Sequence, residues 1–184
     1  MRAQEALKRL LELEFQTVLD VGAGGDHARV FREYGRSVTT INLYDADYVG
    51  DYLTSDLGTF DCVWASHVLE HNPNPGLFLK KCFSDLNDDG ILAVTVPPLK
   101  HEIVGGHVTL WNAGILIYQI ILSGNDCSQA MVRTHGYNVS VIVRKRPIEL
   151  PGLKMDYGDI DTLSEYFPFP AEHGFDGRIE GCNW

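Results

Sequence analysis

The chain has 184 residues, of which 45% are hydrophobic and 22% are charged, and its formal net charge is −10 at pH 7. This length suits one α/β domain with a modest extension, and the composition is ordinary for a globular protein. The negative charge would repel phosphate backbones, so no nucleic-acid partner is expected. No apolar run reaches the ~20 residues of a membrane span and no secretion signal is visible, so we expect no membrane partner and a cytoplasmic location.

The first predicted elements are a helix, a strand and a second helix. Leucines and alanines recur at helical spacing among charged residues over 3–13, which predicts an amphipathic helix that packs on the sheet or on a partner subunit. Residues 17–21 predict a buried strand. Asp26 can cap a second helix, which should end near Gly35.

A glycine turn, residues 22–25, joins that strand to the second helix. Gly22 and Gly24 permit a tight turn and a close approach of the backbone to a ligand, and Asp20 at the strand end should point into the same crevice. A dinucleotide fingerprint starting at Gly22 would need glycine at position 27, which is His27. An acidic strand end favours instead a ligand with an ammonium group, such as S-adenosylmethionine.

The next two predicted strands cover residues 37–43 and 48–52. In nucleotide-binding folds of this kind, an acidic residue about 20 positions after the first glycine binds the ribose hydroxyls. Asn42 takes that position here, so either Asn42 makes neutral hydrogen bonds or Asp45 binds the ribose. We favour Asn42, with Leu43 beside the ribose.

A further apolar strand starts at Phe60 and breaks after Ser66 into a polar loop that carries histidines. A helix over 76–86 and a turn at 87–90 follow. They lead to residues 91–96, a continuous apolar run typical of a central parallel strand.

Residues 20–24 and 60–71 together resemble the class I S-adenosylmethionine-dependent methyltransferases. In that family D-x-G-x-G follows the first strand and F-D-x-V-x-x-x-x-x-L-E-H follows the fourth, and the resemblance spans about residues 18–98. It implies an α/β, Rossmann-like fold with a mostly parallel seven-stranded sheet, an antiparallel edge hairpin and helices on both faces. It also implies S-adenosyl-L-methionine as cofactor and S-adenosyl-L-homocysteine as product.

The resemblance assigns cofactor contacts to the strand ends. Asp51 would contact the adenine amino group and Tyr52 would form a wall of the adenine site, although Asp51 could equally be a turn residue after Gly50. Ser66 and His67 should lie against the methionine part of the cofactor. The expected cofactor-binding residues are Asp20, Gly22, Ala23, Gly24, Asn42, Leu43, Asp51, Tyr52, Ser66 and His67.

The acceptor loop, residues 100–112, is polar and glycine-rich and precedes an apolar helix over 113–122. It follows a strand at the carboxyl end of the sheet, where open α/β folds bind substrates, so we expect it to bind the methyl acceptor. Strands over 129–134 and 137–144 should form an antiparallel edge pair.

The chain changes character after residue 146. We expect residues 1–146 to form the S-adenosylmethionine-binding domain, and residues 147–184 to form an acidic, aromatic-rich extension that packs on the domain or on a partner. A short helix is expected near 161–167, and the last ten residues could be disordered. The extension or the first helix could mediate a homodimer.

Methyl transfer from a sulfonium needs mainly orientation and a dry cavity. For a hydroxyl acceptor a base helps, and histidine titrates near neutral pH. We prefer His107 as the general base, with His71 as the other candidate; the alternative for each is an ordinary loop histidine. Glu70, His101 and Trp111 are expected to contact the acceptor.

Candidate metal ligands are scattered along the sequence. The four cysteines, Cys62, Cys82, Cys127 and Cys182, form no C-x-x-C pair. No three ligands share metal-binding spacing on one predicted element, and the remaining alternative is a pair of His101 and His107. We therefore expect no metal site.

The leading hypothesis is a methyltransferase that acts on oxygen or nitrogen of a small molecule, such as a sugar or another metabolite. The alternative is a methyltransferase-like, non-catalytic binding or scaffold protein, which the neutral Asn42 would favour. A nucleotide-dependent oxidoreductase is a third hypothesis, disfavoured by His27.

Overall fold

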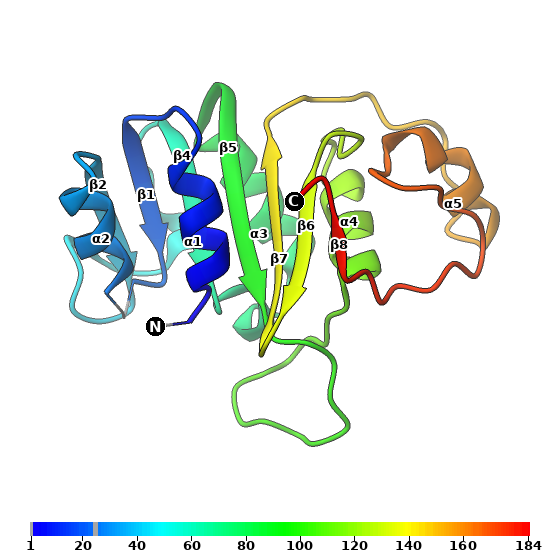
Figure 1. Cartoon of the computed structure of the whole chain (residues 1–184), viewed down its shortest axis with the longest axis horizontal. Helices are drawn as coiled ribbons and strands as arrows, with labels where there is room; N and C mark the ends of the chain where they lie inside the picture. Colours follow the sequence, from blue (N-terminus) through cyan, green and yellow to red (C-terminus); the bar gives the residue numbers. More distant parts are fainter. Residues whose placement is uncertain (1, 24–25) are drawn as a thin grey trace.

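An eight-stranded sheet runs through the computed structural model, which describes residues 2–23 and 26–184 (Figure 1). The strands are β1 (Thr17–Val21), β2 (Ser37–Asn42), β3 (Tyr48–Val49), β4 (Phe60–Ser66), β5 (Leu86–Val96), β6 (Met131–His135), β7 (Asn138–Arg144) and β8 (Gly181–Cys182). Their order in space is β3-β2-β1-β4-β5-β7-β6-β8. Strands β1 to β5 pair in parallel, whereas β6, β7 and β8 pair antiparallel.

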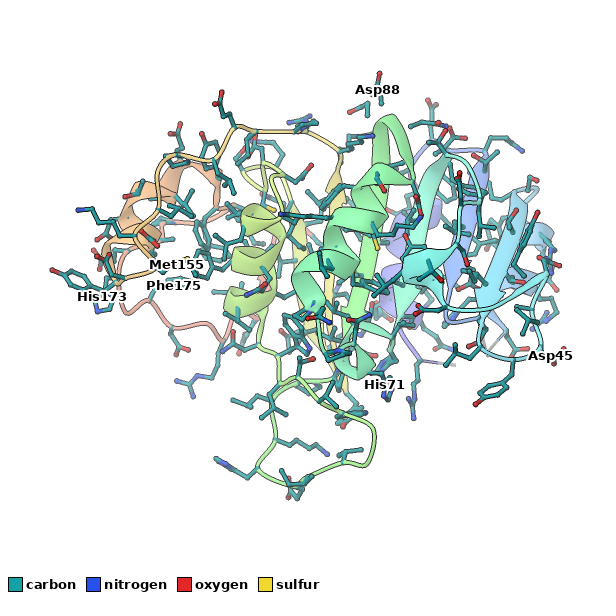
Figure 2. The ribbon with its side chains drawn as sticks, turned by 180° about the vertical axis from the view of Figure 1, so that it is seen from behind. Asp45, His71, Asp88, Met155, His173 and Phe175 are labelled. Carbon is teal, nitrogen blue, oxygen red and sulfur yellow. The ribbon has the colours of Figure 1, made fainter. Side chains whose placement is uncertain are left out.

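Helices cover both faces of this sheet. Helices α1 (Gln4–Leu11) and α2 (His27–Glu33) lie on the face seen in Figure 1, and α3 (Pro75–Ser84) and α4 (Ala113–Leu122) lie on the face seen in Figure 2. The short helices are η1 (Tyr52–Thr54), η2 (Leu69–His71), α5 (Gly158–Thr162) and η3 (Ser164–Tyr166). Within the described residues, none of the helices combines the length and apolar character that crossing a bilayer requires.

The alternation of strand residues divides the core between the two faces. In β1, Val18 belongs to the core under α1 and α2, whereas Leu19 and Val21 belong to the core under α3 and α4. Trp64 of β4, 1% exposed, packs edge-to-face on Phe31 of α2 with ring centroids 5.7 Å apart. Both faces of the central strands are therefore apolar, as expected for parallel strands covered on two sides.

The predicted fold class is confirmed, with a mostly parallel sheet, an antiparallel edge and helices on both faces. The third strand is shorter than predicted, because the chain leaves the sheet after Val49 and forms η1. The turn predicted at 87–90 lies inside β5. Leu86 pairs with Phe60 and pairing then resumes between Ile91 and Cys62, so the turn residues bulge out between two registers.

The C-terminal extension, residues 147–184, packs on α4 and β6. Leu163 and Phe167 are buried in the same core cluster as the apolar face of α4. The backbone N–H of Gly114 donates to the carbonyl oxygen of Gly177 at 2.9 Å. The last residues, which could have been disordered, form β8 on the edge of β6, so the sheet has one strand more than the seven predicted.

The two segments proposed as dimer contacts both use their apolar faces within the chain. Ala6, Leu7 and Leu10 of α1 are buried against the sheet. The aromatic side chains of Phe167 and Phe175 in the extension pack on each other with ring centroids 5.6 Å apart. A dimer would therefore have to use the outer sides of these segments.

Candidate functional site

A pocket of about 580 Å³ opens at the carboxyl ends of β1, β2 and β4. This volume lies within the range of roughly 300–1,000 Å³ that is common for small-molecule sites. Tyr52 and Phe78 give it apolar walls, and their rings pack edge-to-face at 5.3 Å. The predicted site residues that line it are Gly22, Asn42, Leu43, Asp51, Tyr52, His67 and His71.

The glycine turn contacts the loop after β4. Gly22 has a φ of +74°, and its N–H donates to the carbonyl oxygen of Ile41 at 2.8 Å. A Cβ atom at this position would lie 2.2 Å from Cγ2 of Val68. Glycine is thus required both by the backbone conformation and by the approach of Val68, and the two sequence motifs meet here. Ala23 is next to this contact, and Gly24 lies outside the described residues.

Asn42 connects the end of β2 to the glycine turn. Its Nδ2 donates to the carbonyl oxygen of Ala23, and its Oδ1 accepts from the N–H of Leu43 at 2.8 Å. A carboxylate could not make the first of these bonds because it has no proton to donate. The alternative ribose ligand, Asp45, is exposed and does not line the pocket; Figure 2 shows it at the far edge of the sheet.

Asp51 and Tyr52 lie where the chain leaves the sheet after β3. Oδ1 of Asp51 accepts from the N–H of Leu53 at 3.0 Å and caps η1, so the turn role considered from the sequence is present. Asp51 nevertheless lines the pocket together with Tyr52, whose side chain is 7% exposed. Both residues can face a bound ligand.

Asp20 is buried on the other side of β1. By strand alternation it lies with Val18 on the face that α1 and α2 cover, and it does not line the pocket. Burial raises the pKa of its carboxyl group to about 7, against an opposing effect of the nearby Arg32. Burial therefore makes the ionised form of Asp20 unfavourable. Carboxyl groups with pKa values shifted in this way are frequent at ligand-binding and catalytic sites.

His67 is held in a fixed tautomer after β4. It has a φ of +57°, and its N–H donates to the carbonyl oxygen of Thr95 at 2.8 Å. Its Nε2 lies 2.9 Å from Oδ1 of Asn138, an acceptor, so Nε2 carries the ring proton. Nδ1 then carries a lone pair, and this atom lies 3.3 Å from Oε1 of Glu70. Ser66, just before it, has a buried hydroxyl without a partner among the described residues.

Glu70 is completely buried, and among the described residues neither of its carboxylate oxygens has a hydrogen-bond partner. Its carbonyl oxygen accepts from the N–H groups of Val108 at 2.9 Å and Thr109 at 3.3 Å. These bonds hold the acceptor loop, seen projecting from the end of the sheet in Figure 1, against η2. The side chain of Glu70 is thus enclosed beside the pocket.

His71 and His107 complete a cluster around this carboxylate. Nδ1 of His71 donates to the carbonyl oxygen of Gly106 at 2.8 Å, and Nε2 lies 3.8 Å from Oε1 of Glu70. The rings of His71 and His107 pack edge-to-face with centroids 4.9 Å apart. One ligand atom from each of Glu70, His71 and His107 lies within 4.8 Å of the others, and we call these three residues the Glu70 cluster. Figure 2 shows His71 next to the acceptor loop.

The other residues predicted to bind the acceptor lie apart from this cluster. Trp111 is 3% exposed and closes the base of the acceptor loop, where its indole N–H donates to Oγ1 of Thr109 at 2.9 Å. His101 is exposed at the start of the loop and does not line the pocket. The structure therefore brings His71 and His107 to Glu70 but does not bring His101 there.

Several lining residues were not predicted. Val68, Phe78 and residues 72–74 border the pocket, and Asn138 holds His67 from β7. Residues 72–74 directly follow the L-E-H motif, so their position in the sequence could have indicated them. Asn138 is 71 residues from its partner, and no local pattern connects the two.

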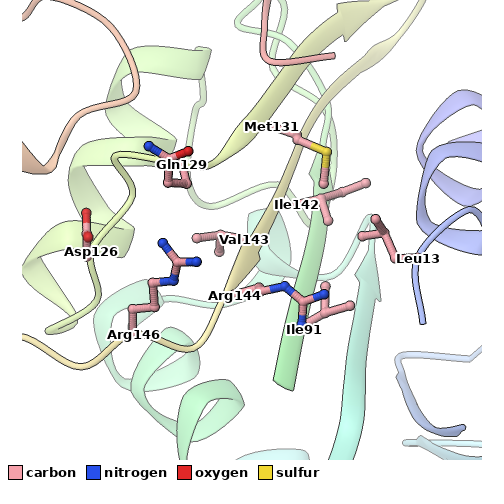
Figure 3. A pocket seen from close by; sticks show the side chains of 9 residues that line it. All are labelled: Leu13, Ile91, Asp126, Gln129, Met131, Ile142, Val143, Arg144 and Arg146. Atoms are coloured by element: carbon pink, nitrogen blue, oxygen red, sulfur yellow. The ribbon is translucent and has the colours of Figure 1, made fainter. Parts of the chain in front are cut away.

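A second pocket, of about 140 Å³, lies away from this region (Figure 3). It is bordered by Leu13 after α1, by Met131 of β6 and by Arg144 at the end of β7. Arg144 already donates to the carboxylate of Asp89 at 3.1 Å. None of the predicted site residues lines this pocket.

Comparison with known proteins gives a family and a fold. Residues 2–137 match a family model described as a methyltransferase domain. A comparison with curated proteins gave no match.

Three solved structures illustrate the likeness in fold. The 1,6-didemethyltoxoflavin-N1-methyltransferase of Burkholderia thailandensis, with 1,6-didemethyltoxoflavin and S-adenosylhomocysteine bound, is 17% identical over 77% of each chain, with a TM-score of 0.63. An O-methyltransferase family protein of the same organism is 14% identical over 79% of this chain and 56% of that chain, with a TM-score of 0.61. The N-terminal domain of EvdMO1, in the presence of S-adenosylhomocysteine and D-fucose, is 16% identical over 79% and 85%, with a TM-score of 0.57.

Proposed function

The chain belongs to the family of methyltransferase domains, and we propose that it transfers a methyl group from S-adenosylmethionine to an oxygen or nitrogen atom of a small molecule. The observation that carries the proposal is the 580 Å³ pocket, where the glycine turn and the loop after β4 meet. S-adenosylmethionine supplies the methyl group on a positively charged sulfur, and S-adenosylhomocysteine is the product.

The pocket residues suit the parts of this cofactor. Leu43 and Tyr52 offer apolar surface to the adenine, and Asn42 and Asp51 offer polar atoms to the ribose and the adenine amino group. His67 lines the side of the pocket toward η2, where the resemblance puts the methionine part. The carboxyl group of Asp20, buried at the end of β1, would favour the positive charges of the cofactor when it is ionised.

A small-molecule acceptor is supported by charge and by the fold relatives. A net charge of −10 disfavours nucleic acid. The relatives include an enzyme solved with 1,6-didemethyltoxoflavin and a domain solved in the presence of D-fucose. The acceptor loop, bonded to the backbone of Glu70, borders the side where such a molecule would enter.

We propose that the chain orients the acceptor and activates it through the Glu70 cluster. Nδ1 of His71 is engaged by Gly106, so Nε2 can take a proton from a hydroxyl acceptor. His107, on the loop itself, is the preferred proton acceptor, and His71 is the second. Glu70 and Trp111 contribute by holding the acceptor loop, and His101 contacts the acceptor only if the loop closes further.

We also propose that residues 1–146 and 147–184 fold as one cooperative unit. The extension supplies β8 and buried aromatic side chains to the same core. Its removal should therefore weaken the whole fold rather than release a separate domain.

Isothermal titration calorimetry with S-adenosylmethionine, S-adenosylhomocysteine and NAD tests the cofactor assignment. Binding of the first two and not of NAD is expected. Asn42→Ala should weaken binding about tenfold, the effect of one lost hydrogen bond, whereas the exposed Asp45→Ala should leave it unchanged. NAD binding, or a loss confined to Asp45→Ala, would contradict the assignment.

A non-catalytic binding protein is the second candidate, because the Asn42 side chain already bonds to Ala23 and Leu43 within the chain. The two functions differ in turnover. A methyltransferase should release S-adenosylhomocysteine from methyl-labelled cofactor when small-molecule extracts are added, whereas a binding protein should not.

A further inference from the structure

The carboxyl group of Glu70 is buried among described residues that give it no hydrogen-bond donor. Its side chain is 0% exposed, and neither oxygen has a hydrogen-bond partner among the described residues. An ionised carboxylate without a partner is one of the most costly groups to bury. A cation held beside Glu70 would offset this cost.

In their neutral forms the neighbouring histidines offer Glu70 lone pairs rather than N–H groups. His67 uses its ring proton on Asn138, and His71 uses its ring proton on the carbonyl oxygen of Gly106. The lone pairs of His67 Nδ1 and His71 Nε2 therefore face Oε1 of Glu70, at 3.3 Å and 3.8 Å. A histidine whose second nitrogen donates to a carbonyl oxygen is the usual form of a metal-binding histidine.

We propose that Glu70, His71 and His107 bind a divalent transition-metal ion. One ligand atom from each lies within 4.8 Å of the other two. Ligands around one zinc ion lie roughly 3.4 Å apart, so the most widely spaced of the three atoms must close by up to about 1.4 Å. Gly105 and Gly106 directly precede His107, and glycine backbone adapts to such a shift at low cost.

The ligand set selects the kind of metal. Two imidazoles and one carboxylate leave at least one coordination position open, which is the pattern of catalytic zinc sites. Imidazole suits zinc and cobalt, whereas Mg²⁺ prefers oxygen ligands and retained water. We therefore infer a zinc-type ion rather than magnesium.

The position of the Glu70 cluster indicates a role for such an ion in activating the methyl acceptor. His71 belongs to the cluster and also lines the proposed cofactor pocket, so the open coordination position lies next to that pocket. A divalent cation acidifies a bound water or hydroxyl, so it would favour an acceptor with a hydroxyl group over an amine. This role rests on the proposed function, whereas metal binding itself does not. With the ion bound, the two ring nitrogens are ligands and no longer proton acceptors.

Titration of the tag-free, chelator-treated full chain with CoCl₂ tests the proposal, because Co²⁺ in an N/O site of low coordination number absorbs visible light. Calorimetry with ZnCl₂ and with MgCl₂ gives the stoichiometry. We expect one Co²⁺ or Zn²⁺ per chain and at least about 100-fold weaker binding in Glu70→Gln and in His107→Ala, since even outer partners of metal ligands cost 10–100-fold. His101→Ala, on the same loop but outside the cluster, should bind like the wild type.

Absence of Co²⁺ and Zn²⁺ binding, preference for Mg²⁺, or unchanged binding in His107→Ala would overturn the proposal. His107 is half-buried in the acceptor loop rather than in the core, so its variant tests the site even if Glu70→Gln fails to fold. S-adenosylmethionine is titrated into the same samples. Metal binding without cofactor binding would refute the proposed function alone, and cofactor binding without metal binding would refute this inference alone.

Discussion

Substitution of Gly22 by alanine should introduce both backbone strain and a steric clash with Val68, where the glycine turn meets the loop after β4. Gly22 has a φ of +74°, where an L-residue costs roughly 1–2 kcal/mol. Its new Cβ would lie 2.2 Å from Cγ2 of Val68, and overpacking of this kind costs roughly 1–3 kcal/mol. We therefore expect Gly22→Ala to lower the free energy of unfolding by about 2–5 kcal/mol.

The steric part should disappear when Val68 is shortened. In the double variant Gly22→Ala/Val68→Ala only the backbone strain and the small loss from Val68→Ala remain, so the double variant should be about 1–3 kcal/mol more stable than the sum of the single losses predicts. Urea unfolding of the four proteins measures this coupling energy.

Gly35 provides the matched control. Its φ is +76°, but a Cβ atom there would meet no atom within 4 Å. Gly35→Ala should therefore cost only the backbone strain, roughly 1–2 kcal/mol, and should add to Val68→Ala without coupling. Additivity within about 0.5 kcal/mol in the Gly22 cycle would refute the contact between the glycine turn and the loop after β4.

Three further predictions concern other parts of the chain. The pKa of Asp20 is raised from 3.8 to about 7, so between these pH values the folded state keeps a proton that the unfolded state loses. The free energy of unfolding should therefore fall by up to about 4 kcal/mol as the pH rises from 4 to 7. Urea unfolding at several pH values measures this change, and Asp20→Asn should remove it. Asn42→Asp should lower the free energy of unfolding by about 1–2 kcal/mol, because a carboxylate cannot donate to the Ala23 carbonyl; an unchanged melting curve would speak against that bond. A Cβ on Gly114 would lie 2.6 Å from Cα of Gly177, so Gly114→Ala should loosen the extension at a net cost of about 1–2 kcal/mol and speed its cleavage in limited proteolysis.

Local patterns predicted the elements that the sheet needs most. The apolar runs of β1, β4 and β5 are buried on both faces, so their sequences alone mark them as central strands. The pattern failed where distant pairing decides the outcome. The turn signal at 87–90 predicted a break between two elements, which was wrong: Leu86 pairs with Phe60, so these residues form a bulge within β5. Nothing local marks Gly181 and Cys182 as a strand, because their pairing with β6 depends on how the extension folds back.

The candidate site was predictable at the strand ends and less so beyond them. Gly22 and Asn42 line the pocket because parallel strands deliver their carboxyl ends to one edge. Trp111 was expected at the acceptor, but its indole N–H is already used by Thr109, and the ring is buried at the base of the loop. His67 and His71 flank Glu70 on the same segment, but the approach of His107 depends on a contact between two loops, which no spacing in the sequence encodes.

Both outer strands of the sheet are two residues long, β3 at one side and β8 at the other. An outer strand offers unpaired N–H and C=O groups to any other chain that can add a strand, and such additions seed aggregates. A two-residue strand offers too few of these groups to hold a partner. β8 in particular covers part of β6, a five-residue strand that would otherwise be open along its length. The extension therefore protects the molecule against association through its own sheet.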